Sequence, residues 1–185
     1  GLVLHFITMK MRVENAAVLS FDTQDRLFRL SASRGYKGSV ARISLHVDHP
    51  LVERMRKERD AIQLHDIFEK LDAEQDEAKK QDLKIISDEM IMLGTKCAIP
   101  SFLGKELRNV LLIGDKKSGE PHTSEDISLL MTLAQESSIA IENARLYDEA
   151  IKKQKQLGQI NDQLENSKKM LVQALAQAEG ANKQL

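Results

Sequence analysis

The chain has 185 residues, of which 42% are hydrophobic and 30% charged, enough for one domain of ordinary size plus an additional segment. Lys and Arg number 27 against 28 Asp and Glu, so the formal net charge of -1 disfavours a nucleic-acid-binding protein. The single cysteine, Cys97, excludes an internal disulfide and favours a reducing, cytoplasmic location. No apolar stretch approaches the roughly 20 residues of a membrane-spanning helix, so we expect no membrane contact by this segment.

The N-terminal part is predicted to be one helix followed by three strands. Apolar residues at helical spacing predict a helix within residues 1–13. Because the chain begins at Gly1 without a methionine or a signal-like start, we expect this helix to be truncated and the chain to be a piece of a longer protein. From residue 16 the apolar period changes to two on both sides of a turn at residues 22–25, which predicts a β-hairpin. A third short strand is predicted at residues 43–47.

A helix-start pattern follows the third strand. Asp48, the expected N-cap, precedes Pro50 and a predicted helix over residues 51–59. Ile62 and Leu64 then indicate another short strand.

Residues 66–94 carry apolar side chains at helical spacing and predict one or two helices that end at Gly94. We interpret the charged run at residues 69–84 as a solvated surface rather than a docking site. Three aromatic residues are expected in the core: Phe21, Phe28 and Phe68.

The C-terminal part is predicted to be a second hairpin followed by a long helix. The hairpin consists of two apolar runs at residues 97–103 and 110–113, which are typical of buried central strands. A loop at residues 115–121 leads to a capping-box pattern at residues 123–126, and no proline follows it. Up to Tyr147 the helix is apolar on a broad side, which predicts packing on the sheet. We expect this interface to be filled by Leu19, Leu30, Ile99, Val110, Leu112, Leu130 and Ile141.

Beyond Tyr147 the apolar side of the helix narrows to a row with the heptad spacing of a coiled coil. We call this row the heptad seam; it contains Leu157, Ile160, Leu164, Leu171, Ala174 and Leu185. A helix this polar cannot bury the row alone, so a second copy of the chain is the simplest partner. The sequence therefore divides into a domain at residues 1–147 and a coiled-coil signalling helix at residues 148–185.

The second hairpin and the following helix carry a recognisable pattern over residues 97–121, 124–130 and 139–147. This pattern resembles the second half of a GAF domain, in particular those of bacterial sensor histidine kinases and diguanylate cyclases. The resemblance implies an α+β fold similar to PAS domains, with a central antiparallel sheet of five to six strands flanked by helices, plus the long C-terminal helix. Asn109 and His122 depart from the family's usual glycine and aromatic residue, so we expect the second hairpin to bend differently.

The resemblance also implies a pocket between the sheet and its connecting helices, which we expect Tyr36, His65, Asp66 and Phe102 to line. The sequence leaves the ligand and any cofactor unknown. One cysteine cannot support the thiol relay of GAF-like methionine sulfoxide reductases, and Cys97 is interpreted as buried rather than as a bilin attachment site. The histidines are interpreted as surface residues, and no metal-ligand spacing occurs.

We therefore expect a cytoplasmic sensory and dimerisation module of a bacterial signal-transduction protein, with no reaction of its own. The expected output domain in the same polypeptide is a two-component histidine kinase, with a diguanylate cyclase as the alternative. A purely structural dimerisation domain without a ligand stays open as a rival interpretation. The expected partner is a second copy in a parallel homodimer, and an unknown small molecule is a further candidate.

Overall fold

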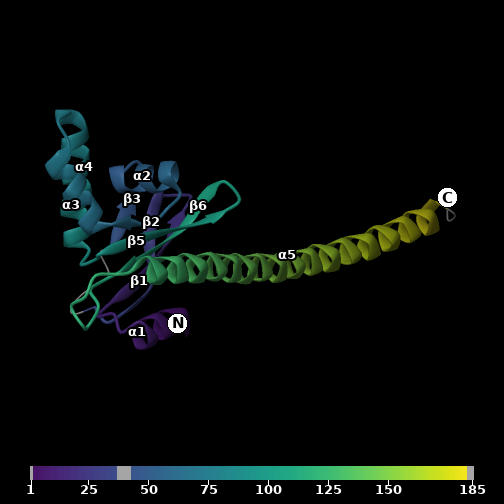
Figure 1. Ribbon diagram of the computed structural model, residues 1–185. Coiled ribbons are helices and arrows are strands. Elements are labelled where there is room, and N and C mark those ends of the chain that lie inside the picture. The colour runs from purple at the N-terminus through teal and green to yellow at the C-terminus, as the bar shows by residue number, and fades with distance from the viewer. Residues whose placement is uncertain (1, 37–42, 183–185) are drawn as a thin grey trace. The chain divides into compact units, whose positions relative to one another are not determined.

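The computed structural model describes residues 2–36 and 43–182, with the side chains of residues 3–36 and 43–174. The chain forms two compact units, Gly1–Ala140 and Ile141–Leu185. The first unit contains a six-stranded sheet with the strand order β3-β2-β1-β6-β5-β4, and its neighbouring strands pair antiparallel (Figure 1). Both predicted hairpins are present, and β1 and β6 lie at the centre.

The strands are β1 (Ala16–Asp22), β2 (Leu27–Arg34), β3 (Ser44–His46), β4 (Ile62–Gln63), β5 (Cys97–Leu103) and β6 (Glu106–Ile113). The helices are α1 (Leu2–Lys10), α2 (Pro50–Glu58), α3 (Leu64–Ala73), α4 (Glu77–Met92) and α5 (Ser124–Asn182). The region predicted as one or two helices before Gly94 is thus two helices. Of the heptad seam, Leu185 lies outside the described residues.

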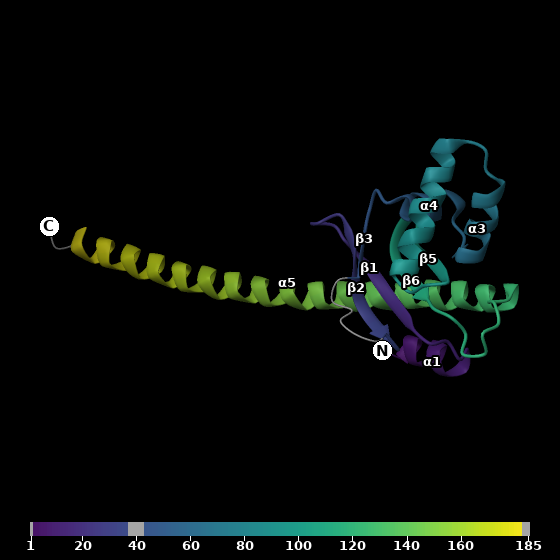
Figure 2. The ribbon, with the colours of Figure 1, turned by 90° about the vertical axis from the view of Figure 1, so that its left-hand side faces the viewer.

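Helices cover both faces of the sheet in the first unit (Figures 1 and 2). Because side chains alternate along a strand, successive residues of β6 enter two different cores. Val110 and Leu112 lie in the core beneath α2, α3 and α4, whereas Leu111 and Ile113 lie in the core beneath α1 and the first turns of α5. All four are buried, which explains why β6 is apolar without alternation.

Of the seven residues expected in one helix–sheet interface, five are buried and divided between these two cores, so the prediction of a single interface was wrong. Three lie on the side of α2 to α4 and two on the side of α5: Leu19, Val110 and Leu112, and Ile99 and Leu130, respectively. Leu30 is only partly buried, and Ile141, which belongs to the second unit, is 40% exposed. The helical spacing of apolar residues predicts which side of a helix is apolar. It does not predict how much of that side another element covers.

Polar side chains also join the sheet to α5. Ser20 Oγ donates to Asn109 Oδ1 at 2.7 Å, and Asn109 Nδ2 donates to Ser138 Oγ of α5. Ser101 Oγ donates to the carbonyl of Ala134 at 2.8 Å. Since Ser101, Asn109 and Ser138 are buried, these bonds satisfy groups that would otherwise be costly to remove from water.

A further contact reaches the backbone of β5. The register of the β5–β6 pair shifts between Ser101 and Phe102. Gln135 of α5 donates from Nε2 to the Phe102 carbonyl at 2.8 Å and accepts from the Phe102 amide at 3.3 Å through Oε1. Strand β4 pairs only with Cys97 and Ala98, so this contact lies beyond the part of β5 that β4 covers.

Two predicted element boundaries are corrected by the structure. His49, not Asp48, caps α2, because its ring Nδ1 accepts a hydrogen bond from the Leu51 amide at 3.2 Å. Leu64, predicted as a strand residue, is the first residue of α3, although its amide still donates to the Lys96 carbonyl at 2.9 Å. The short strand therefore passes directly into a helix.

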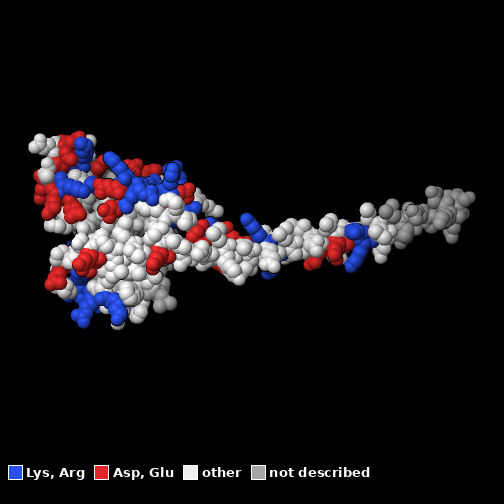
Figure 3. Space-filling model, turned by 45° about the vertical axis from the view of Figure 1, so that its right-hand side comes forward, with Lys and Arg blue, Asp and Glu red and all other residues white. Residues whose placement is uncertain are grey.

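Most charged side chains of the run at residues 69–84 are exposed on α3 and α4, and Figure 3 shows mixed charges crowding this region of the first unit. Exposure in a single chain is expected of a solvated surface and of a docking site alike, so the solvated interpretation stays a prediction. Phe68 is 42% exposed, so its assignment to the core was wrong, whereas Phe28 is fully buried and Phe21 partly buried. Within residues 2–36 and 43–182, no helix is both long and apolar enough to cross a membrane.

Candidate functional site

The four residues expected in one pocket do not lie together. Tyr36 lines a cavity of about 700 Å³ with Asn15. His65 lines a second cavity of about 470 Å³, and Phe102 lines a third of about 530 Å³, where the Arg59 guanidinium carbon is 3.9 Å from the Phe102 ring centroid. Asp66 follows His65 in the first turn of α3 and is not among the residues that line these three cavities.

The cavity at Tyr36 is built around the side chain of Asn15. Asn15 Nδ2 donates to the Gly94 carbonyl at 3.0 Å, and a Cβ atom on Gly114 would lie 1.5 Å from Asn15 Oδ1. The hydroxyl of Tyr36 is buried, and burial raises the pKa of Tyr36 to about 12, which the nearby Asn15 side chain offsets only in part. This phenol therefore stays protonated at physiological pH.

The cavity at Phe102 is lined in part by Met131, Thr132, Gln135 and Glu136 of α5, whereas the cavity at His65 borders the loop that leads into α5. The cavity at His65 lies between the start of α3, Lys96 and the loop at residues 114–123 that joins β6 to α5, and we call it the α3–loop cavity. Leu64, Phe68 and Pro121 give it apolar walls. Charged and titratable side chains complete its lining: His65, Lys96, Asp115, Lys116, Glu120 and His122. Small-molecule sites are usually lined mainly by apolar side chains, whereas this lining has six charged or titratable side chains beside three apolar ones.

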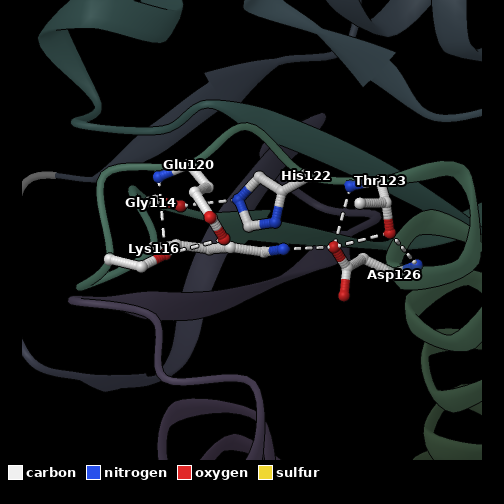
Figure 4. A network of polar contacts seen from close by, with 7 residues as sticks. Gly114, Lys116, Glu120, His122, Thr123 and Asp126 are labelled. Carbon is white, nitrogen blue, oxygen red and sulfur yellow. Dashed lines mark hydrogen bonds and ion pairs between the residues drawn. The ribbon is translucent and has the colours of Figure 1, made fainter.

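The loop that lines this cavity is fixed to the first turn of α5 (Figure 4). Lys116 Nζ lies 2.5 Å from Asp126 Oδ2, and both side chains are mostly buried. The same Asp126 oxygen accepts from the Thr123 amide at 2.7 Å and from its hydroxyl at 2.9 Å, while the Asp126 amide donates to Thr123 Oγ1 at 3.2 Å. This is the reciprocal capping box predicted from the sequence, with Lys116 added to it.

His122 holds the other end of the loop (Figure 4). Its Nε2 lies 2.9 Å from the Gly114 carbonyl, and because a carbonyl only accepts, Nε2 carries the proton. The remaining ring nitrogen, Nδ1, is buried and has no hydrogen-bond partner among the described residues. His122, a residue of the cavity lining, thus keeps one buried ring nitrogen without a hydrogen-bond partner in the described part of the chain.

Asp126 makes the link between loop and helix dependent on pH. Burial opposes ionisation of this carboxyl, but the hydrogen bonds from Lys116 and Thr123 outweigh burial and lower the pKa of Asp126. A lowered pKa in the folded state stabilises the fold above the unfolded value of about 3.9. This contribution is lost as the pH falls through the lower, folded value.

We expect Asp126→Asn to lower the free energy of unfolding by about 1–2 kcal/mol at pH 7, since it removes charge-assisted bonds at a helix start. Urea unfolding from pH 7 to pH 2 should show the difference from the unmodified chain shrinking below about pH 4. Asp115→Asn is the control, because this exposed carboxylate is 3.8 Å from Lys96 and should matter little. An equal deficit at both ends of the pH range would contradict the assignment.

The remaining candidate groups are positioned as follows. Cys97 is fully buried, and burial, followed by the carboxylates of Asp66 and Asp60, raises the pKa of its thiol. A buried neutral thiol is a poor nucleophile. No group of three His, Cys, Asp or Glu residues among those described is arranged to hold a metal ion.

Sequence reasoning found part of the site. The spacing of Thr123 and Asp126 predicted the capping box, and His65 was expected in a pocket. Lys116 was missed, because its partner is ten residues away and a lysine in a polar loop carries no local signal of burial. The bonds of Asn109 to Ser20 and Ser138 were also missed, although the unusual residue at position 109 was noticed.

No protein-family model matches the chain, and no curated protein matches it. Solved structures do match. The GAF domain/HD domain protein from Geobacter sulfurreducens is 16% identical with a TM-score of 0.59, over 78% of this chain and 90% of that chain. The GAF domain of a two-component sensor histidine kinase from Bacillus halodurans is 18% identical with a TM-score of 0.53, over 79% of this chain and 95% of that chain.

A third structure agrees with these two. The GAF domain of a phosphoenolpyruvate-protein phosphotransferase from Acinetobacter is 19% identical with a TM-score of 0.54, over 77% of this chain and 80% of that chain. The chain therefore has the α+β GAF fold, a curled antiparallel sheet with helices on its faces and a long C-terminal helix.

Proposed function

We propose that the chain is the sensory and dimerisation module of a bacterial signal-transduction protein, specifically a cytoplasmic two-component sensor histidine kinase. The observation that carries this proposal is the Lys116–Asp126 contact, because it connects the wall of a cavity to the first turn of the longest helix. A GAF domain of a sensor histidine kinase is one of the solved structures with this fold, beside GAF domains of other proteins. The chain itself would carry out no reaction.

The proposed mechanism follows from this connection. A small molecule in the α3–loop cavity would contact residues of the loop at 114–123 and favour one of its conformations. Because Lys116 and His122 belong to this loop, a change in its conformation would alter the capping of α5. The helix would then pass the change to an output domain in the same polypeptide, as a rotation or a change of register.

The transmitting form would be a parallel homodimer paired through the heptad seam, with no nucleic acid and no membrane contact. Leu157, Ile160, Leu164 and Leu171 are all exposed in the single chain. Since exposed apolar rows of this kind are stabilised by pairing, a second copy is the natural partner. A diguanylate cyclase as the output domain is the alternative.

The rival without a ligand has one observation in its favour. On the sheet face opposite α5, where the resemblance implies a pocket, large side chains occupy the core and are fully buried: Phe28, Leu45, Leu51, Met55, Ile67 and Met90. Native mass spectrometry of freshly purified protein separates the two hypotheses. A bound small molecule that Phe68→Ala displaces supports the sensory module, whereas a dimer without added mass in every preparation supports the structural rival.

The dimer itself is tested by charge substitution. Leu164→Lys combined with Leu171→Lys is expected to give monomers in sedimentation equilibrium, because two lysines would meet their counterparts in the seam. The matched control is Ile151→Lys with Val172→Lys, which changes exposed apolar residues outside the seam and should leave the dimer intact. A monomeric unmodified chain at tens of micromolar would refute the dimer.

A further inference from the structure

We propose that His49 is a pH-sensitive switch between α2 and α4. In its neutral form the ring caps α2, and in its protonated form it releases this cap and pairs with Glu89 of α4. The inference does not depend on the proposed function, because it involves neither the α3–loop cavity nor the heptad seam. It gives the first unit a response to acidification that needs no bound small molecule.

The ring of His49 contacts both helices. Its Nδ1 accepts a hydrogen bond from the Leu51 amide at 3.2 Å, and its Nε2 lies 3.7 Å from Glu89 Oε2. Because a ring nitrogen that accepts from an amide carries no proton, the neutral ring holds its one proton on Nε2, on the side of Glu89. The side chains of His49 and Glu89 are each 17% exposed. Both are therefore largely shielded from water, which strengthens the interaction between their charges.

Protonation and capping exclude each other at His49. A second proton can bind only at Nδ1, which then becomes a donor and can no longer accept from the Leu51 amide. The positive end of the α2 dipole also repels a cation at this place. Leu51 is fully buried, so the loss of the acceptor for its amide destabilises the first turn of α2. The amides of Val52 and Glu53 keep their acceptor, the His49 carbonyl, so the change is confined to that turn.

The charges around the ring favour Glu89 as its partner in the protonated form. The charged and titratable groups of the segments that meet at His49 come from the β1–β2 turn, the preceding loop, α2 and α4: Arg26, His46, Asp48, Glu53, Arg56 and Glu89. Asp48 is exposed and pairs with Arg26 at 3.2 Å, so water and that arginine weaken its effect on the ring. In the described part of the chain, Glu89 is the carboxylate paired with His49.

Burial keeps the neutral, capping form dominant at neutral pH. It lowers the pKa of His49 and raises the pKa of Glu89. A histidine whose folded pKa lies below the unfolded value of about 6.5 stabilises the fold above that pH, and this contribution is lost as the pH falls below it. The raised pKa of Glu89 has the opposite effect, a gain in stability as the pH falls through its folded value. Variants are therefore needed to separate the two groups.

Nuclear magnetic resonance of the full chain tests the switch. A titration from about pH 8 to about pH 4 should protonate His49 at Nδ1, and the amide resonance of Leu51 should shift with the same midpoint. Glu89→Gln should lower this midpoint, because the imidazolium loses its carboxylate. A Leu51 amide that stays unchanged while the His49 ring gains its proton would overturn the proposal, as would a ring that is still neutral at about pH 4.

His49→Asn provides the matched variant, because asparagine caps helices well and does not titrate. We expect it to hold the Leu51 amide resonance constant across the titration, whereas His46→Asn should leave the transition in place. His46 is a suitable control because its Nδ1 accepts from the Asp48 amide at 3.3 Å, while its side chain is 54% exposed. In urea unfolding, the stability of His49→Asn relative to the unmodified chain should rise below about pH 6.5. A difference that does not change with pH would contradict the switch.

Discussion

Replacing Leu112 with alanine is expected to lower the free energy of unfolding by about 2–5 kcal/mol. Leu112 is fully buried in the central strand β6, within the core under α2, α3 and α4. Its partners in the two neighbouring strands are Ala17 and Ala98. Because neither alanine can extend into the space that a leucine leaves, the cavity would persist, which favours the upper part of the range.

Urea unfolding followed by far-ultraviolet circular dichroism measures this effect. Leu103→Ala is the matched control, because Leu103 lies at the end of β5 and is only partly buried. We expect the control to lose clearly less stability. Equal losses for the two variants would contradict the placement of Leu112 in the core.

Gly35→Ala is expected to cost about 3 kcal/mol, since it combines backbone strain with a steric clash. Gly35 has a φ of +80°, and a Cβ atom there would lie 2.0 Å from the Glu14 carbonyl oxygen. The backbone at Glu14 is held in place by two hydrogen bonds and cannot easily move. The Glu14 amide donates to the Asp115 carbonyl at 2.8 Å, and the Gly114 amide donates to the Asn15 carbonyl at 2.9 Å. The clash would therefore be transmitted to the loop that lines the α3–loop cavity.

Gly104→Ala measures the cost of backbone strain without a steric clash. Gly104 also has a positive φ, +62°, but nothing lies within 4 Å of an added Cβ atom. Its replacement should lower the free energy of unfolding by about 1 kcal/mol, which is the cost of holding alanine in the left-handed conformation. Thermal unfolding of the two variants should therefore differ clearly, and equal melting temperatures would show that the Glu14 contact is not rigid.

The strands could be predicted because apolar residues recur at every second position along them, which places these residues on one face of the sheet. Leu19 and Phe28 fit this pattern and are buried as expected. The side of the sheet on which a residue lies could not be predicted for the second half of β6, because both of its faces are covered and residues 110–113 are all apolar. Burial on the helices was equally hard to predict, as Ile141 and Phe68 show. An apolar side chain of a helix is buried only where another element covers it.

The site was less predictable than the fold for a different reason. The shape of a pocket depends on how loops and helix ends pack against one another. This packing is set by contacts between residues that are far apart in the sequence. Tyr36, His65 and Phe102 each border a cavity, as expected, but in three different places. Only the local capping spacing of Thr123 and Asp126 could be predicted at the level of atoms.

Gln135 has a consequence for how this protein avoids unwanted assembly. An exposed strand edge invites a strand from another molecule, and β4 is too short to shield β5 along its length. By bonding both backbone groups of Phe102, the glutamine amide takes the place of an incoming peptide group. Pro100, two residues earlier, has no amide hydrogen to offer. At Phe102 the edge of β5 is thereby closed to the addition of a strand from another molecule, and with it to aggregation through sheet growth at this point.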